Sequence, residues 1–161
     1  MANIAYLLLG TNLGDKRYNL HEATNLLSLQ TGQLLKSSAV YETLPWGVTD
    51  QPSYWNQALQ LQTQLSPQAL LTAINDIEKA LGRERRIRWE SRLIDIDIIY
   101  FNDLVLQTES LVIPHPHLAN RRFVLVPLTE IAPHYIHPVL RVTNQHLLDT
   151  CPDTLSVLKL S

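Results

Sequence analysis

The order in which the hydrophobic periodicity changes along the chain constrains the fold more than any other feature of the sequence. Four stretches are short apolar runs or alternate between apolar and polar residues, which predicts strands. These stretches are residues 3–9, 34–44, 55–65 and 93–101. Between them, apolar residues recur at helical spacing from Asp15 to Gly32 and from Ser66 to Gly82. Each predicted helix begins at a capping residue and stops at a glycine, so both its ends are marked.

The resulting order is strand, helix, strand, strand, helix, strand, which is typical of the split βαβ arrangement of ferredoxin-like domains. Connection rules then predict an α+β fold, with an antiparallel sheet and both helices on one face. After a turn at Asn102 and Asp103, we expect a short returning edge strand at 104–106 and a C-terminal extension of short helices and loops. A length of 161 residues suits one domain covering residues 1–161.

The composition excludes several classes of protein. The chain is 45% hydrophobic and 17% charged, as expected of an ordered globular domain. It has no apolar run of the roughly 20 residues that a membrane helix needs, and no signal peptide, so we expect a cytoplasmic protein without a membrane partner. Cys151 is the only cysteine, which excludes an internal disulfide and a cysteine zinc cluster. The net charge of −2 argues against a nucleic-acid partner. We further expect a monomer.

Positive charge is concentrated in one short segment before the last predicted strand. Residues 83–92 contain five of the chain's 13 basic residues and only two acids. The five are Arg83, Arg85, Arg86, Arg88 and Arg92. Such a cluster indicates either a local anion-binding site or a solvated arginine loop.

The predicted strand at 93–101 carries two acids. Side chains alternate along a strand, so Asp95 and Asp97 lie on one side, about 6.6 Å apart, while the isoleucines face the helices. A buried unpaired carboxylate is costly, so these acids need water, an arginine partner or a metal. A solvated or arginine-paired face is one interpretation. The other is a magnesium site shared with substrate phosphates, which nearby guanidinium groups would also bind. This would be a phosphoryl-transfer site without a P-loop, since that motif is absent.

The stretch RWESRLIDIDIIYF at 88–101 resembles the signature of the 6-hydroxymethyl-7,8-dihydropterin pyrophosphokinase family of folate biosynthesis. Four other blocks resemble the same family and occur in its order. These blocks are YLLLGTNLGD at 6–15, YETLPWGVTDQPSYWNQAL at 41–59, IEKALGRER at 77–85 and IPHPHLANRRFVLVPLTEIAP at 113–133. The resemblance therefore covers most of the chain and does not depend on one motif.

The resemblance implies transfer of pyrophosphate from MgATP to the hydroxymethyl group of the pterin, with release of AMP. Asp95 and Asp97 would hold two Mg²⁺ ions that bridge the ATP phosphates, and Arg83 and Arg92 would stabilise the transferring group. The catalytic residues implied are thus Arg83, Arg92, Asp95 and Asp97, and the partners are the two small-molecule substrates, with ATP as co-substrate.

The resemblance also implies where the two substrates bind. A pterin is flat and rich in donors and acceptors, so its site needs aromatic faces and polar groups at the edge. Tyr54 and Phe123 would stack on it and Thr43 and Asn56 would bond its edge, with the backbone near Leu44 and Trp46 completing the pocket. The implied ATP-binding residues are Asn75, Glu78, Arg85, Arg88, Trp89, Ile98, His115 and Arg121. Alternation independently puts Asn56 on the polar, wet face of its strand, which we expect beside the strand of Asp95.

Three positions depart from the family's usual residues. Glu90 replaces a glycine, Leu44 replaces a common proline, and Arg122 replaces a small residue. None of them is an implied metal ligand or stacking ring, so they bear on the rate and on loop motion rather than on the type of reaction.

Two other functions are compatible with the same strand order. One is a non-catalytic ferredoxin-like module that binds nucleotides or RNA, which would show aromatic residues on its central strands and a broad basic face. The other is a family member that has lost catalysis and serves as a scaffold. Asp95, Asp97 and the arginine cluster argue against both.

Overall fold

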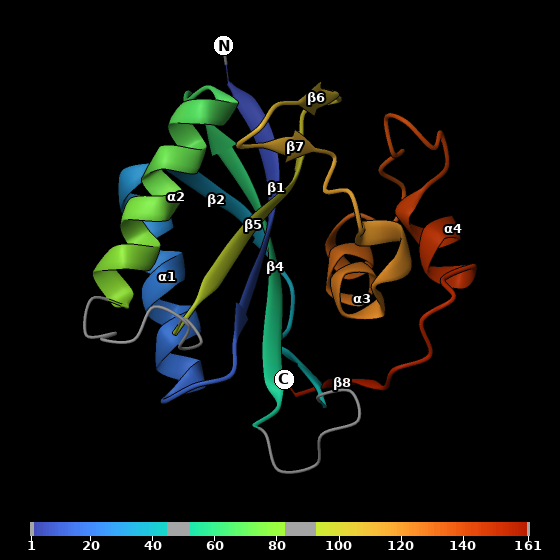
Figure 1. The fold of residues 1–161 in the computed structure, drawn as a ribbon, viewed down its shortest axis with the longest axis horizontal. Coiled ribbons are helices and arrows are strands. Elements are labelled where there is room, and N and C mark those ends of the chain that lie inside the picture. Colours follow the sequence, from blue (N-terminus) through green and yellow to red (C-terminus); the bar gives the residue numbers. More distant parts are fainter. Residues whose placement is uncertain (1, 45–51, 83–92, 161) are drawn as a thin grey trace.

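The computed structural model describes residues 2–44, 52–82 and 93–160. The chain forms strands and helices in the predicted order, followed by a C-terminal region that crosses to the other side of the sheet (Figure 1). The strands are β1 (Asn3–Thr11), β2 (Gly32–Ser37), β3 (Tyr41–Thr43), β4 (Tyr54–Thr63), β5 (Asp95–Phe101), β6 (Leu106–Gln107), β7 (Val112–Ile113) and β8 (Val157–Lys159). The helices are α1 (Lys16–Gln30), α2 (Pro67–Leu81), α3 (Arg122–Ile131) and α4 (Asn144–Asp149), with a 3₁₀ turn at Leu118–Asn120.

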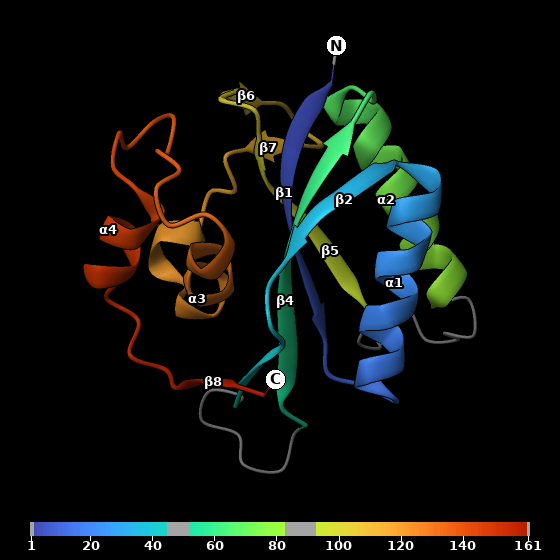
Figure 2. The ribbon, with the colours of Figure 1, turned by 180° about the vertical axis from the view of Figure 1, so that it is seen from behind.

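The main sheet is antiparallel and has the strand order β5-β1-β4-β3-β8, with β2 also paired to β4. Helices α1 and α2 cover one face, whereas α3 and α4 lie on the opposite side, as the front and back views show (Figures 1 and 2). The ferredoxin-like α+β fold, with the first two helices on one face, is therefore confirmed.

The two long helices begin and end where their local sequence predicts. The Asp15 carboxylate accepts the Tyr18 N–H at 3.0 Å, and the Ser66 hydroxyl accepts the Ala69 N–H at 3.1 Å. Each bond satisfies a backbone donor that the first turn of a helix leaves unpaired. Pro67 follows Ser66 at the first helical position, where a missing N–H costs nothing.

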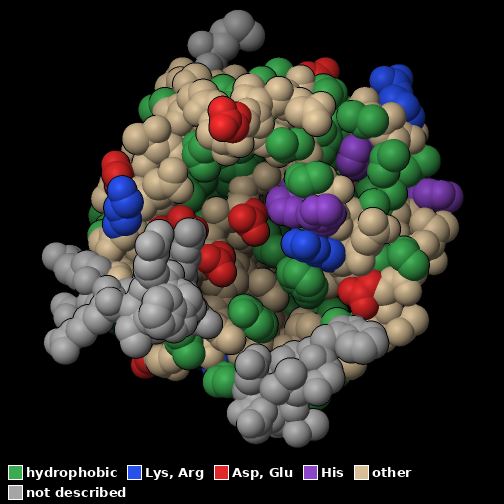
Figure 3. Space-filling view, viewed as in Figure 1, with side chains coloured by type: hydrophobic (Ala, Val, Ile, Leu, Met, Phe, Trp, Pro, Cys, Tyr) green, Lys and Arg blue, Asp and Glu red, His purple; other side chains and the backbone are tan. Residues whose placement is uncertain are grey.

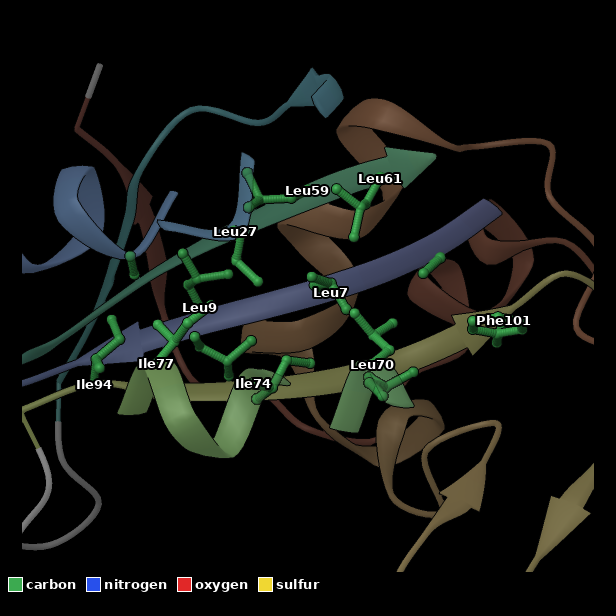
Figure 4. Packing of buried hydrophobic residues seen from close by; sticks show 14 of the residues in the cluster. Leu7, Leu9, Leu27, Leu59, Leu61, Leu70, Ile74, Ile77, Ile94 and Phe101 are labelled. Atoms are coloured by element: carbon green, nitrogen blue, oxygen red, sulfur yellow. The ribbon is translucent and has the colours of Figure 1, made fainter. Parts of the chain in front are cut away.

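A first hydrophobic core fills the space between the sheet and helices α1 and α2. Leucines and isoleucines from both layers point toward each other there (Figure 4). The cluster includes Leu7, Leu9, Leu27, Leu59, Leu61, Leu70, Ile74 and Ile77. Ile94, Ile96 and Ile98 belong to the same core, so the predicted orientation of the isoleucines is confirmed.

A second core lies on the opposite face, and it corrects one prediction. We expected the face of β4 that carries Asn56 and Ala58 to be wet. Instead, α3 lies over it, and Ala58 is fully buried in a cluster with Leu8, Leu125 and Leu128. The polar residues on this face gave it a solvated pattern, but the helix that covers it comes from far along the chain. Alternation in the local sequence shows which face of a strand is polar. Whether that face is buried depends on packing against distant segments of the chain.

The predicted strand at 34–44 is two strands. Residues 38–40 separate β2 from β3, and each strand pairs with a different part of β4. At the break, the Ser38 N–H donates to the Ala58 carbonyl and the Ser38 hydroxyl accepts the Ala58 N–H, both at 2.9 Å. A serine side chain thus replaces a strand residue in bonding the backbone of β4, and the regular ladder is interrupted.

Two further boundaries differ from the predictions. The short strand expected to return to the sheet at 104–106 is β6, which pairs with β7 in a separate two-stranded sheet. The main sheet is extended instead by β8 from the C-terminal region, through its pairing with β3. No helix in the described ranges combines the length and the apolar character needed to cross a bilayer.

Candidate active site

A cavity of about 340 Å³ opens on the α3 side of the sheet. Its walls come from β1, β3, β4 and β5, from the start of α3, and from the segment before β8. The lining residues are Leu8, Gly10, Thr43, Leu44, Tyr54, Asn56, Asp95, Asp97, Arg121, Phe123 and Leu155. Figure 3 shows a hollow in this face, with acidic side chains on one side and histidine and basic side chains on the other.

Gly10 of β1 lines the cavity between residues of the two neighbouring strands. In the sheet register, Gly10 pairs with Asn56 of β4 on one side and with Asp95 of β5 on the other. A Cβ atom at this position would lie 2.7 Å from Asn56 Nδ2, closer than carbon and nitrogen can approach. A side chain at this position would therefore have to displace the Asn56 amide. Strand β1 also separates two strands that we expected to be neighbours.

The two carboxylates lie on the cavity side of an edge strand that α2 holds in place. Asp95 and Asp97 are both exposed and both line the cavity. Between them in sequence, the Ile96 N–H donates to the Glu78 carboxylate at 2.8 Å. This bond ties α2 to β5, so the strand that carries both acids is anchored by its neighbouring helix.

Thr43 and Asn56 each present a buried polar atom that lacks a partner in the described part of the chain. These atoms are Thr43 Oγ1 and Asn56 Oδ1, in side chains that are 6% and 4% exposed. Asn56 Nδ2 donates to the Leu9 carbonyl at 3.2 Å, which leaves the amide oxygen as the unused acceptor. Burying such atoms unpaired costs about 1–3 kcal/mol each, a cost that a ligand with matching polar groups would remove.

Two aromatic rings stand at the same cavity. Tyr54 is 39% exposed, and Phe123 is half-buried at the start of α3, at the margin of the second core. The Arg121 guanidinium lies 5.9 Å from the centre of the Phe123 ring. Exposed ring faces beside unused hydrogen-bonding atoms suit a flat, polar heterocycle.

A hydrogen-bond network fixes the strand ends that carry Thr43 and Tyr54. The Glu42 carboxylate accepts the Ser53 hydroxyl at 2.6 Å and the Trp55 Nε1–H at 3.3 Å. Because Thr43 pairs with Tyr54 in the β3–β4 register, these bonds from the neighbouring residues hold the two lining side chains together.

His115 lies outside the cavity lining but next to it, in the turn after β7. Its backbone N–H donates to the Ile99 carbonyl at 3.0 Å, which attaches the turn to β5. Burial, together with the positive charges of Arg121 and His117, lowers the pKa of His115 to about 4. Its Nδ1 accepts the His117 N–H at 3.2 Å, so the neutral ring carries its proton on Nε2. His115 is therefore a neutral donor at pH 7.

The donor set of the cavity fits magnesium bound together with a phosphate substrate. In the described ranges, no group of three or more histidine, cysteine, aspartate or glutamate side chains could hold a metal by itself. Mg²⁺ usually takes only one or two carboxylates from the protein and shares its remaining positions with water and substrate phosphates. Asp95 and Asp97 satisfy that requirement at the mouth of the cavity.

Comparison with known proteins identifies the family. The chain matches the 7,8-dihydro-6-hydroxymethylpterin-pyrophosphokinase (HPPK) family over residues 6–133. It is 44% identical to the 2-amino-4-hydroxy-6-hydroxymethyldihydropteridine pyrophosphokinase of Bacillus subtilis over 132 residues, covering 81% of this chain and 79% of that protein. The chain belongs to the HPPK family.

Other relatives differ in how much of their length the chain spans. The pyrophosphokinase of Aquifex aeolicus is 42% identical over 136 residues, which cover 84% of each chain. The folic acid synthesis protein FOL1 of Dictyostelium discoideum is 42% identical over 151 residues, which cover 94% of this chain but only 23% of that protein. A crystal structure of Plasmodium falciparum HPPK-DHPS superposes with a TM-score of 0.77 over 92% of this chain and 44% of that one, and at 21% identity it shows the shared fold.

Membership in the HPPK family assigns the chain the family's reaction, pyrophosphoryl transfer from ATP to hydroxymethyldihydropterin in folate synthesis. The predicted residues that line the cavity are Thr43, Leu44, Tyr54, Asn56, Asp95, Asp97, Arg121 and Phe123. Four residues predicted to bind ATP lie outside the lining: His115, Glu78, Asn75 and Ile98. His115 is next to the cavity, Glu78 bonds β5, Asn75 is exposed on α2, and Ile98 is in the first core. The predictions for Trp46, Arg83, Arg85, Arg88, Trp89 and Arg92 fall outside the described residues, as does the departure at Glu90.

Three residues that line the cavity were not among the predicted site residues. Leu8 and Gly10 belong to the strand in the first of the family-like blocks, and the glycine directly after an apolar run was a usable signal of close backbone approach. Leu155 carried no signal, because nothing in its local sequence indicates that the chain returns to the cavity there.

Proposed function

We propose that the HPPK reaction takes place in this cavity, with the pterin at the end formed by β3, β4 and α3 and the ATP phosphates at Asp95 and Asp97. The observation that carries the proposal is that one cavity combines two unlike sets of groups. Unpaired buried atoms of Thr43 and Asn56 stand beside two rings, and β5 carries two exposed carboxylates, Asp95 opposite Gly10 and Asp97 opposite Leu8. A heterocycle and a phosphate chain would each find their own partners there.

In this proposal, the pterin ring lies between Tyr54 and Phe123. Thr43 Oγ1 and Asn56 Oδ1 bond its polar edge, which removes the cost of leaving them unpaired. Because the register places Asn56 and Asp95 on either side of Gly10, a ring bonded to Asn56 has its far side directed toward the carboxylates. The hydroxymethyl oxygen is thereby held close to the phosphates, which supplies the orientation that transfer requires.

Asp95 and Asp97 would hold two Mg²⁺ ions, which when bound would offset the phosphate charge that repels the incoming oxygen. Arg121 adds a fixed positive charge at the same cavity, and neutral His115 offers a donor beside it. Arg83 and Arg92 as stabilisers of the transferring group remain predictions, as do Arg85, Arg88 and Trp89 at the nucleotide and Trp46 at the pterin.

The reaction is tested by incubating the purified protein with hydroxymethyldihydropterin and MgATP. We expect equal amounts of AMP and pterin pyrophosphate, because the bond that breaks joins the α- and β-phosphates. Formation of ADP, or no turnover at all, would contradict the proposal. A magnesium titration with EDTA-treated protein should show no AMP until the metal is restored.

The alternative of a non-catalytic nucleotide- or RNA-binding module is not favoured. Of the residues that line the cavity from the central strands β1 and β4, only Tyr54 is aromatic, and the edge strand β5 adds the negative charges of Asp95 and Asp97. A salt titration of RNA binding separates the two functions, since tight binding that weakens steeply with salt would support the module.

We also propose that the chain acts as a single domain over residues 1–161, as a monomer in the cytoplasm, without a nucleic-acid partner. The net charge of −2 supports the last point. Size-exclusion chromatography with light scattering at working concentration tests the monomer, for which a mass near 18.4 kDa is expected.

A further inference from the structure

The last segment of the chain before β8 returns to the cavity from the far side of the molecule. After α4, the chain passes below α3 and reaches β8 at the edge of the main sheet (Figures 1 and 2). On the way, Leu155 becomes part of the cavity lining. This segment lies beyond residues 6–133, the part of the chain that matches the HPPK family.

Asp153 connects this segment to the start of α3. One of its carboxylate oxygens accepts the Arg122 N–H at 3.0 Å, and the other accepts the Leu155 N–H, also at 3.0 Å. Arg121, which precedes the helix, provides no side-chain cap. A carboxylate from a distant segment therefore satisfies a donor in the first turn of α3, where negative charge is also favoured.

The other side of the segment is attached to β3. Val157 of β8 pairs with Thr43, and the Leu160 N–H donates to the Val40 carbonyl at 2.8 Å. Leu155 thus lies between two anchored points. Asp153 holds one at the helix that carries Phe123, and Val157 holds the other at the strand that carries Thr43.

From this arrangement we propose that segment 153–157 forms a wall of the pterin end of the cavity, with Leu155 as a specificity-determining residue and Asp153 as a positioning residue. The proposal rests on the proposed function. Leu155 limits the space beside Phe123, so the fit of the ring depends on its size. Asp153 acts through its two hydrogen bonds, by holding Leu155 and the first turn of α3 in fixed relative positions.

The test compares Leu155→Ala with Leu158→Ala. Leu158 belongs to the same terminal segment but is 54% exposed and does not line the cavity, so it is the matched control. For Leu155→Ala, we expect KM for hydroxymethyldihydropterin to rise by about tenfold, as for loss of apolar contact in a substrate pocket. KM for ATP should change less than about twofold, and Leu158→Ala should behave as the unmodified protein.

The role of Asp153 is tested with Asp153→Ala and Asp153→Asn. Asp153→Ala removes both acceptors, so we expect it to weaken pterin binding. Asp153→Asn keeps one oxygen, so it should recover part of the pterin affinity that the alanine variant loses. Calorimetric titration with hydroxymethyldihydropterin, in the presence of magnesium and a non-hydrolysable ATP analogue, gives the pterin affinity. Titration with the ATP analogue alone gives the nucleotide affinity, which should stay unchanged.

The outcomes separate this inference from the proposed function. If the unmodified protein makes no AMP, the proposed function fails first. If the unmodified protein makes AMP but Leu155→Ala and Leu158→Ala have the same KM for hydroxymethyldihydropterin, the inference is overturned while the proposed function stands. Equal losses of pterin and ATP affinity in Asp153→Ala would indicate a merely structural role and would overturn the positioning role. If Asp153→Ala does not fold, the comparison of Leu155→Ala with Leu158→Ala still tests whether segment 153–157 forms a wall of the cavity.

Discussion

The two faces of the main sheet are built from the same strands but serve different purposes. On the face toward α1 and α2, leucines and isoleucines from both layers pack together as the first core. On the opposite face, β1 contributes Tyr6 and Leu8 to the second core and then Gly10 to the lining of the cavity. One end of this face is therefore core, and the other end is the candidate active site.

The difference between the faces comes from the helices that cover them. The first face is covered by α1 and α2, which are adjacent to the strands in sequence, so its apolar side chains are buried in one continuous cluster. The second face is covered by α3 only in part, and most of the strand residues that line the cavity there are glycine or carry polar side chains. Substitutions on the first face should therefore change stability, whereas substitutions at the cavity end of the second face should change catalysis.

The largest effect is expected for Asp97→Ala on the cavity face. Turnover should fall by about three orders of magnitude, because the substrate phosphates lose a proposed metal ligand. Tm should hardly change, since the side chain is exposed. AMP formation and thermal unfolding measure the two quantities, and Asp76→Ala, an exposed acid on α2, is the control. Turnover within tenfold of the unmodified protein would contradict the assignment.

The opposite behaviour is expected for Ile74→Ala in the first core. Ile74 is fully buried between α2 and the sheet. Its truncation should lower the free energy of unfolding by about 3 kcal/mol, through lost apolar contact and the cavity left behind. Urea unfolding measures the loss, while kcat per folded molecule should be unchanged. A large fall in kcat at full folding would show that the two faces are not independent.

Two glycines allow a sharper comparison, because each replacement by alanine clashes with a different kind of atom. At Gly10 the new Cβ meets the Asn56 amide, whereas at Gly32 it would lie 2.0 Å from the backbone carbonyl oxygen of Gln62. Gly32→Ala should therefore destabilise the fold by about 1–3 kcal/mol, since backbone must move. Gly10→Ala should displace the Asn56 amide and raise KM for the pterin by about tenfold, with a smaller loss of Tm. If both variants lost stability equally and kept their KM, Gly10 would have no special role in the site.

The smallest effect concerns the pH dependence of stability. Burial lowers the pKa of His115 to about 4, whereas the unfolded chain has a pKa near the ordinary value of about 6.5. Between these values the unfolded state binds the extra proton, so stability falls as the pH is lowered from about 6.5 to about 4. His115→Gln should lose less Tm over that range than the unmodified protein, by a few degrees. Thermal unfolding at several pH values, with exposed His134→Gln as control, measures the difference; parallel curves for all three would contradict it.

Much of the fold was predictable because its signals are local. The capping residues Asp15 and Ser66 mark their helices, and the alternation around Asp95 and Asp97 shows which side of β5 is buried. The errors have a common origin. The division of 34–44 depends on Ser38 bonding β4, and the burial of Ala58 depends on α3, so both require contacts between distant segments.

The candidate site shows the same division. Its carboxylates, rings and buried polar side chains could be chosen from motif blocks, because each lies in a short stretch with a characteristic pattern. For Leu155 there was no local signal, and for Gly10 the local sequence indicated close approach without showing which residues it approaches. Gly10 matters through its partners on both neighbouring strands, and Leu155 matters because Asp153 and Val157 fasten its segment to α3 and β3.

By itself, the sequence determined the order of strands and helices, the core side of β5 and the chemical character of the site, because periodicity, capping and residue type act over a few neighbouring positions. Only the tertiary structure decided which residues meet across the cavity, that β1 separates Asn56 from Asp95, and that the C-terminal segment reaches the cavity lining. These features depend on sheet register and on packing between residues far apart in the chain, which no local pattern encodes.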